Sequence, residues 1–358
     1  MRIRAERDDL ADVLARAGRA VSNRSPLPIL QGILCEVSGN QLRVTGTDSE
    51  VTIRTALEVE ALEEGRTLIP AKLAAEAVRK LPVGAVTMAS AGGHVEITGN
   101  GPRFRLRELS VDDYPVSGSR PQGSGLTYDG DLLAKAIAQV GMAASGDDAR
   151  PTLTGVLFES DEDGSRLVAT DGYRLAVREL PGAEQAPTTL VPHRALKEMS
   201  RTIGDSKIAV ELGEREATFA SDRGSMTVRV IEGSFPTYRH FFGEFPHRLT
   251  VGREALAEAV GRASLVAEDH IPVRLNLHDG GVELVITRQE VGEETEHIDS
   301  DYQGDELTIA FNVRYLADGI SAVDGEQVTL DVTDPVKPGM LSAAGDDSFR
   351  YLLMPVRV

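Results

Sequence analysis

The chain has 358 residues, of which 41% are hydrophobic and 26% charged, a composition typical of soluble globular proteins. No apolar run reaches the length of a membrane-spanning helix, and the N-terminus MRIRAERDDL lacks the apolar stretch of a signal peptide, so we expect a cytoplasmic protein of two or three domains. The formal charge of −18 argues at first sight against nucleic acid as a partner, although a polyanion meets only the surface nearest to it.

The first predicted helix comes early and carries apolar residues at helical spacing: Leu10, Val13, Leu14, Ala17 and Val21. A strand pair follows in LPILQGILCEV and LRVTGTD, ending at Asp48. From Thr67, the stretch TLIPAKLAAEAVRKLPVGAVTM predicts a short strand, a second helix and another strand. Tyr114-Pro115 closes this first set of elements.

The same order of elements returns twice. Helical patterns recur over Leu132–Val140 and Leu256–Ala263, and strand pairs follow in RPTLTGVLFES with LVATDG and in IPVRLNLHDGGVELVITR. Strand–helix–strand segments recur from Thr189 and Thr308, spaced 122 and 119 residues from the preceding copy. Such phasing is the signature of an internal repeat.

Three repeats with two helices each and many antiparallel strands predict an α+β fold, with the helices gathered on one face of the sheets. We place the domains at 1–120, 121–243 and 244–358. The boundaries fall in SGSRPQGSG (Ser117–Gly125) and near FFGEFPHR (Phe241–Arg248). With no tryptophan and 4% aromatic residues, the cores must be aliphatic, and the single cysteine, Cys35, is expected to be a buried small hydrophobe.

Motifs that carry catalysis are absent from the sequence. There is no GxxxxGK[ST], no GxGxxG after a strand, no HExxH and no GxSxG, and the seven histidines never stand at metal-ligand spacing. The acidic run QEVGEETEH (Gln289–His297) is interpreted as an exposed hairpin tip rather than a cation site. We therefore expect no metal, no cofactor and no enzymatic activity.

One carboxylate could still suggest a catalytic corner: Asp171 in LVATDGYRLA, beside Thr170 and Gly172. Because TGTD recurs at Thr45–Asp48 in the first repeat, we interpret this acid as turn architecture. A hydrolase using Asp171 and a histidine remains the alternative, and turnover abolished by Asp171→Asn would revive it.

Taken together, RPTLTGVLFE, LVATDGYRLA, FPTYRH, FNVRYLADGI and the terminal YLLMPVRV resemble the bacterial DNA polymerase III beta subunits, the sliding clamps. The resemblance spans essentially the whole chain. It implies a head-to-tail homodimeric ring of six like domains, with the helices lining a hole around duplex DNA and Phe104 and Leu265 at the subunit seam. Phosphate-only contacts suffice for such a ring, since closure supplies retention.

Basic residues on or beside the predicted helices are the candidates for facing the DNA, although each could also be an ordinary solvated residue. They are Arg24, Lys72, Arg79, Lys80, Lys135, Arg194, Lys197 and Arg201.

The resemblance also implies a pocket for partner peptides between the second and third domains. Through it, the polymerase alpha subunit, the clamp loader and repair polymerases would be tethered. The corresponding residues here are Leu153, Thr170, Gly172, Arg174, Leu175, Pro236, His240, Tyr315, Leu352, Met354, Pro355, Val356 and Arg357. This set predicts an apolar cleft rimmed by Arg174 and Arg357.

Departures from the family pattern cluster at that pocket. His240 stands where many members carry arginine, and Phe241-Phe242 replace smaller aliphatic residues. Two alternatives therefore stay open: a variant clamp whose reshaped pocket tolerates inhibitors, and a clamp-fold adaptor that binds peptides without encircling DNA.

Overall fold

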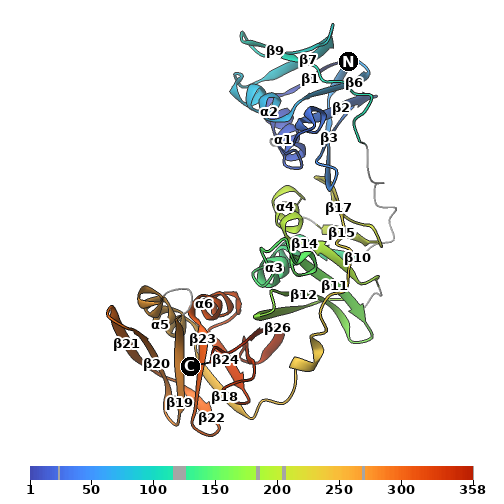
Figure 1. The fold of residues 1–358 in the computed structure, drawn as a ribbon. Helices are drawn as coiled ribbons and strands as arrows, with labels where there is room; N and C mark the ends of the chain where they lie inside the picture. The colour runs from blue at the N-terminus through green and yellow to red at the C-terminus, as the bar shows by residue number, and fades with distance from the viewer. Residues whose placement is uncertain (23–24, 116–125, 183–185, 204–206, 268–270, 358) are drawn as a thin grey trace. The chain divides into compact units, whose positions relative to one another are not determined.

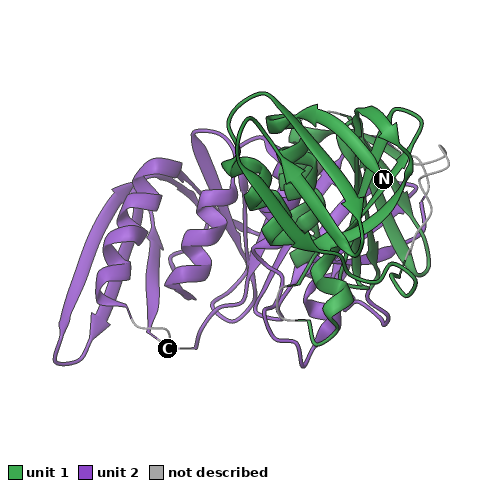
Figure 2. Ribbon diagram, turned by 90° about the horizontal axis from the view of Figure 1, so that it is seen from above, with its two compact units in different colours: residues 1–134, 194–230 green, residues 135–193, 231–358 purple. Residues whose placement is uncertain are grey.

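The computed structural model describes residues 1–22, 25–115, 126–182, 186–203, 207–267 and 271–357. Their fold is α+β, with every strand ladder antiparallel, as the sequence predicts (Figure 1). These residues form two compact units, one of residues 1–134 and 194–230 and the other of residues 135–193 and 231–358 (Figure 2).

Unit 1 contains helices α1 (Arg7–Gly18) and α2 (Ala71–Lys80), which pack against each other. Leu10, Leu14 and Val78 are fully buried between them and the sheets, as the helical spacing of apolar residues requires. Helix α4 (His193–Ile203) also belongs to this unit, apart from its first residue.

Two sheets complete unit 1. The five-stranded sheet has the order β5 (Glu60–Glu63), β1 (Arg2–Glu6), β7 (Ala85–Ala91), β8 (His94–Thr98) and β9 (Arg103–Arg107). The eight-stranded sheet has the order β10 (Leu126–Asp129), β15 (Lys207–Leu212), β16 (Glu216–Ser221), β17 (Gly224–Arg229), β4 (Val51–Glu58), β3 (Gln41–Thr47), β2 (Gly32–Ser38) and β6 (Gly65–Pro70).

Unit 2 contains helices α5 (Arg253–Val266) and α6 (Val313–Ala322), which pack against each other, and α5 also lies on β20 and β21. Helix α3 (Gly130–Gly141) enters this unit at Lys135. The four-stranded sheet has the order β21 (Gly292–Asp299), β20 (Gly281–Arg288), β19 (Pro272–His278) and β23 (Leu307–Asn312).

A nine-stranded sheet forms the rest of unit 2. Its order is β14 (Thr189–Pro192), β11 (Gly155–Asp161), β12 (Gly164–Thr170), β13 (Arg174–Leu180), β26 (Asp346–Leu353), β25 (Gly339–Ala343), β24 (Gln327–Val332), β18 (His247–Gly252) and β22 (Asp301–Gln303). Short 3₁₀ helices stand at η1 (Pro28–Gln31), η2 (Pro151–Leu153) and η3 (Arg239–Phe241).

Neighbouring repeats share sheets, which explains why the compact units cut across the repeats. Strand β17 of the middle repeat pairs with β4 of the first, with Met226 opposite Ile53. Strand β13 pairs with β26 of the third repeat, with Leu175 opposite Leu352. Since both ladders are continuous, the middle repeat is divided between the two units.

The predicted helices are all present among the described residues, and their arrangement in three phased pairs is confirmed. Two details differ. Val21 lies beyond the end of α1, and the acidic run Gln289–His297 is a turn only at Gln289–Val291, because Gly292–His297 belong to strand β21. None of the described helices is long and apolar enough to cross a membrane.

Cys35 is fully buried on β2, as predicted. Burial, with a smaller contribution from the Glu36 carboxylate, raises the pKa of its thiol to about 12. The thiol is therefore protonated at neutral pH and acts as a small hydrophobic side chain.

Candidate functional site

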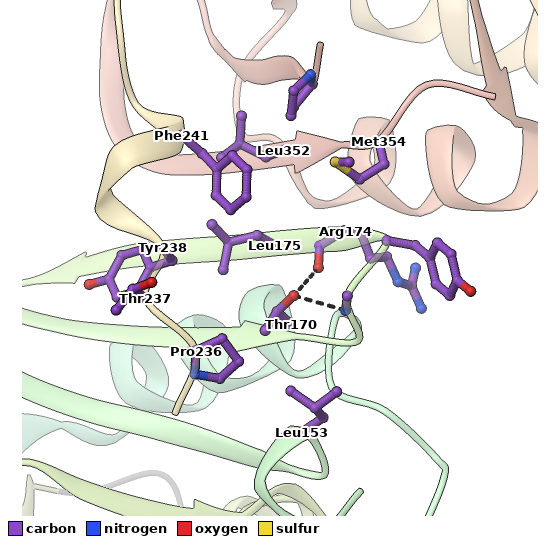
Figure 3. A pocket seen from close by; sticks show the side chains of 13 residues that line it. Leu153, Thr170, Arg174, Leu175, Pro236, Thr237, Tyr238, Phe241, Leu352 and Met354 are labelled. Carbon is purple, nitrogen blue, oxygen red and sulfur yellow. Dashed lines mark hydrogen bonds between the residues drawn. The ribbon is translucent and has the colours of Figure 1, made fainter. Parts of the chain in front are cut away.

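The corner at Asp171 is a hydrogen-bonded turn. Thr170 Oγ1 donates to the Arg174 carbonyl at 2.6 Å and accepts from the Gly172 amide at 3.1 Å (Figure 3). Asp171 Oδ1 accepts from the amides of Tyr173 and Arg174 at 2.9 and 3.0 Å. Gly172 has φ +95°, the left-handed region that glycine adopts without strain. The Asp171 carboxylate therefore stabilises the turn by accepting hydrogen bonds from backbone amides of the turn.

The first repeat contains the same turn. Thr47 Oγ1 donates to the Val51 carbonyl at 2.9 Å and accepts from the Ser49 amide at 3.1 Å. Asp48 Oδ1 accepts from the amides of Glu50 and Val51 at 2.9 and 2.7 Å. Ser49, which replaces the glycine, also has a positive φ of 77°. The interpretation of Asp171 as turn architecture is confirmed.

Arg174 differs from its predicted place at the rim of the pocket. Its guanidinium donates hydrogen bonds to Asp171 Oδ2 at 3.0 Å, to Asp318 Oδ2 at 2.5 Å and to the Tyr351 hydroxyl at 3.3 Å. The same group lies 4.3 Å from the centre of the Tyr315 ring. Burial alone would lower the pKa of Arg174, but Tyr351, Asp318 and Asp171 outweigh it and raise that pKa above its usual value. The charge therefore joins strand β13 to helix α6 and strand β26 and does not project into solvent.

A cavity of about 250 Å³ opens beside this turn (Figure 3). Its wall is formed by strands β12, β13 and β26, helix η2 and the segment between β17 and β18. Its lining residues are Leu153, Thr170, Gly172, Tyr173, Arg174, Leu175, Pro236, Thr237, Tyr238, Phe241, Pro338, Leu352 and Met354. Most of the exposed lining is apolar, which suits aliphatic or aromatic side chains of a ligand.

Of the thirteen residues predicted for a peptide pocket, the structure brings eight together around this cavity: Leu153, Thr170, Gly172, Arg174, Leu175, Pro236, Leu352 and Met354. The other five are not among the residues that line the cavity: His240, Tyr315, Pro355, Val356 and Arg357.

Contacts explain several of these positions. His240 lies against the Phe241 ring, and Tyr315 supports Arg174. The Val356 amide donates to the Ala310 carbonyl of β23 at 2.8 Å. Contact of these residues with a peptide stays a prediction.

Sequence reasoning missed five lining residues: Tyr173, Thr237, Tyr238, Phe241 and Pro338. Tyr173 follows the Thr-Asp-Gly turn directly, so its neighbourhood in the sequence was a usable signal. Pro338 gave no signal, because it precedes β25 in a loop far along the chain from the other lining residues.

The basic residues proposed to face DNA lie on helices, except Arg24, which is outside the described residues. Lys72, Arg79 and Lys80 are exposed on α2, and Arg194, Lys197 and Arg201 are exposed on α4. Lys135 on α3 is also exposed and pairs with Asp324 at 2.7 Å. Arg194 pairs with Glu50 at 3.1 Å and Arg201 with Glu198 at 3.2 Å.

Charge is distributed unevenly between the helices and the rest of the chain. The six α-helices of the described residues hold twelve Lys and Arg against nine Asp and Glu, a formal charge of +3, whereas the whole chain carries −18. Helices α2 and α4 supply the largest excess, three basic residues against one acidic residue each.

Two sheet edges, one in each unit, carry opposite charges. On β9, the edge of the five-stranded sheet, Arg103, Arg105 and Arg107 are exposed, while Phe104 points to the other face and packs against the core. On β21, the edge of the four-stranded sheet, three of four successive residues are glutamates: Glu293, Glu294 and Glu296, the last of which pairs with Arg262 at 2.6 Å. Burial and the neighbouring Glu296 raise the pKa of Glu294. Leu265, at the end of α5, is 84% exposed.

The described residues contain no group of three or more His, Cys, Asp and Glu side chains arranged to hold a metal ion. His278 and His297 stack with ring centres 5.5 Å apart, and Asp299 lies 3.5 Å from His297 Nε2. His297 and Asp299 are exposed and His278 is half-buried, and all three lie on strands β19 and β21 of the four-stranded sheet.

Family models match the chain in three consecutive segments. The N-terminal, central and C-terminal domain models of the DNA polymerase III beta subunit match residues 1–117, 127–237 and 241–357. The beta sliding clamp of Streptomyces coelicolor is 36% identical over the full length of both chains. The beta sliding clamp homolog GriR of Streptomyces muensis is 31% identical over 100% of this chain and 99% of its own.

Solved structures agree. Caulobacter crescentus pol III beta superposes with a TM-score of 0.94 at 30% identity, and both chains are covered in full. A sliding clamp of Pseudomonas aeruginosa, solved bound to griselimycin, gives 0.95 at 27% identity, again over both full chains.

Three α+β repeats that share continuous sheets and each contribute a pair of helices define the DNA clamp class. The chain belongs to the bacterial DNA polymerase III beta subunit family, the beta sliding clamps, which are non-enzymatic processivity factors of DNA replication.

Proposed function

We propose that two copies of this chain close head to tail into a ring around duplex DNA, and that the cavity beside Leu175 holds short peptides of the proteins that the ring tethers. These partners are the polymerase III alpha subunit, the clamp loader and repair polymerases, and the ring works in the cytoplasm. Domains at 1–120, 121–243 and 244–358 would give the ring six similar parts.

The main observation that supports a ring is the pair of oppositely charged sheet edges, β9 and β21. An exposed strand edge invites pairing with another chain, and charge decides which partner is accepted. Two β9 edges would repel each other because both carry arginines, and two β21 edges because both carry glutamates. The β9 edge of one copy is therefore expected to pair with the β21 edge of a second copy. A head-to-tail contact of this type closes into a ring when the rotation between copies allows it.

Exposed apolar residues at the same places strengthen this proposal. Leu265 is 84% exposed at the end of α5, and Phe104 is partly exposed on the face of β9 opposite to the arginines. An apolar centre with a charged rim is the usual anatomy of a stable interface.

The charge on the helices supports duplex DNA as the occupant of the ring. A sliding protein needs a lining that tolerates phosphates without reading bases. The helices have an excess of basic residues in a chain that is otherwise strongly acidic, so helices that line the hole would present its least repulsive surface to DNA.

The properties of the cavity support the proposal that it binds a peptide. It is apolar, it is formed by segments of two neighbouring repeats, and Met354 contributes a flexible thioether that can repack around different anchors. A short peptide with glutamine at its start and leucine and phenylalanine near its end should bind here.

One experiment tests both parts of the proposal. The protein is placed on nicked circular DNA by a clamp loader with ATP, with and without an excess of the free peptide. We expect retention on circles, release after linearisation, and inhibition of loading by the peptide. Failure of retention would favour the adaptor that binds peptides without encircling DNA. The chain is 36% identical to the Streptomyces coelicolor beta sliding clamp and 31% identical to the clamp homolog GriR, which supports the assignment as an ordinary clamp.

A further inference from the structure

One carboxylate of unit 1 binds two arginines at once. Glu198 on α4 accepts a hydrogen bond from Arg19 Nη1 through Oε2 and another from Arg201 Nη1 through Oε1, each at 3.2 Å. Arg201 stands three residues along the same helix, whereas Arg19 belongs to the first repeat and comes directly after the end of α1. The carboxylate therefore joins α4 to the end of α1.

All three side chains of this cluster reach solvent. Their exposed fractions are 43% for Arg19, 34% for Glu198 and 54% for Arg201. Ion pairs on a protein surface typically contribute only about 0–1 kcal/mol to stability. The fold therefore depends little on this cluster, and an anion from outside can approach the two guanidiniums.

The arrangement has the chemistry of a phosphate site. A guanidinium presents its N–H donors in a planar fork that fits the oxygens of carboxylates and phosphates alike. Glu198 thus occupies the place between Arg19 and Arg201 that one phosphate of a DNA backbone could take. Because Glu198 is part of the same compact unit, it reaches this place at a high effective concentration.

Helix α2 offers a comparison, since it also carries three basic residues and one acidic residue, Glu76. Glu76 is exposed and pairs with no arginine or lysine in the part of the chain that the structure describes. Several basic residues of the two helices likewise have no carboxylate partner among the described residues: Lys72, Arg79, Lys80 and Lys197. The acidic residue of α4 is therefore distinguished by its contacts and not by the charge of its helix.

We propose that Glu198 is an internal substitute for a DNA phosphate, which keeps Arg19 and Arg201 from binding the duplex and so keeps the ring free to slide. This inference rests on the proposed function, since it concerns the same contact with DNA. Each arginine that gains a phosphate releases counterions and adds affinity, whereas sliding requires contacts that exchange easily. Glu198 acts here as a positioning residue, because it holds the two arginines and touches no phosphate itself.

The test measures the affinity of the full-length protein for linear duplex DNA over a series of salt concentrations. Glu198→Gln keeps the size of the side chain and removes the charge that holds the arginines. We expect the slope of log affinity against log salt to steepen by about 1–2, because each new phosphate contact adds about 0.9 to it.

Glu76→Gln is the matched control, since it removes the same charge from α2, where the carboxylate holds no arginine among the described residues. The general effect of losing one negative charge appears in both variants, so the difference between their slopes reports the freed arginines. Adding Arg201→Gln to Glu198→Gln should reduce the slope by about 1. Arg201→Gln alone should leave the wild-type slope nearly unchanged, because Glu198 already occupies that arginine.

Two results would overturn this inference. One is an equal slope for Glu198→Gln and Glu76→Gln with thermal melts like that of wild type. The other is an equal effect of Arg201→Gln in the presence and absence of Glu198. Either result leaves the proposed function standing as long as the wild-type protein is retained on circular DNA and released by linearisation. Loss of that retention would overturn the proposed function itself.

Discussion

Arg174 and Asp318, which are 144 residues apart in the chain, meet at 2.5 Å between Nη1 and Oδ2. The same guanidinium holds Asp171, so one buried charge connects the Thr-Asp-Gly turn to helix α6. A buried arginine with two carboxylates is costly to disrupt on one side only, since the remaining charges lose their partner. The turn and the wall of the cavity are thereby fixed to each other.

The first prediction concerns this relationship. Asp171→Asn should lower the free energy of unfolding by about 1–3 kcal/mol, because it removes an ion pair as well as weakening hydrogen bonds to two amides. Peptide affinity should change less than about threefold, since the carboxylate faces the backbone and Arg174.

Asp48→Asn is its matched control, because Asp48 makes the same two amide contacts and has no arginine hydrogen-bond partner among the described residues. Chemical denaturation of both variants should show the smaller loss for Asp48→Asn. Equal losses would mean that the Arg174 pair contributes nothing to stability.

The second prediction concerns Met354, which is 41% exposed and lines the cavity. Met354→Ala should weaken peptide binding by about 1–3 kcal/mol, because truncation removes packing and leaves a gap. Val336→Ala provides the control, since Val336 is also an exposed apolar residue of unit 2 but is not part of the cavity wall. Calorimetric titration that finds both variants equal to wild type would remove Met354 from the binding surface.

The third prediction concerns the subunit seam. Leu265→Arg and Phe104→Arg should each yield monomers at micromolar concentration, because either change buries a charge without a partner in an apolar contact. Leu265→Arg is the cleaner variant, since Leu265 has almost no contact to lose in the monomer. Leu62→Arg on β5, the opposite edge of the five-stranded sheet, should remain dimeric. Light scattering that shows a dimer for both seam variants would place the interface elsewhere.

The fourth prediction concerns DNA. Affinity for linear duplex should be weak and should fall with added salt, as for phosphate-only contacts. Replacing Lys72 and Lys197 with glutamate should reduce the slope of log affinity against log salt by about 1 for each lost phosphate contact. Lys207→Glu, on strand β15, should leave the slope unchanged. Sequence-selective binding to linear DNA would contradict the sliding account.

Much of the fold could be predicted because it repeats. The apolar spacing of Leu10, Leu133 and Leu256 marks equivalent helices, and Thr-Asp at 47–48 and 170–171 marks equivalent turns. Strand pairing between repeats could not be predicted, because alternation of apolar and polar residues fixes which face is buried but not which strand lies alongside. The division of the middle repeat between two compact units follows from that pairing.

The site was predictable to the extent that its residues lie on regular strands. Leu175 and Leu352 stand in motifs that resemble the family and face each other across the β13–β26 ladder. Phe241 was noticed only as a departure, because its exposure depends on ion pairs of Arg239 with residues of β11 about 80 positions earlier. Likewise, the sequence around Arg174 does not indicate that its guanidinium pairs with Asp318.

The central claim is that the protein stays on DNA because it encircles it. The most direct measurement is co-elution of the loaded protein with a nicked plasmid in gel filtration at high salt, before and after a single restriction cut. The account predicts that the dimer elutes with the circle and leaves it after linearisation, and that Leu265→Arg is retained on neither. Equal retention on circular and linear DNA, or none on either by a protein that is dimeric, would contradict it.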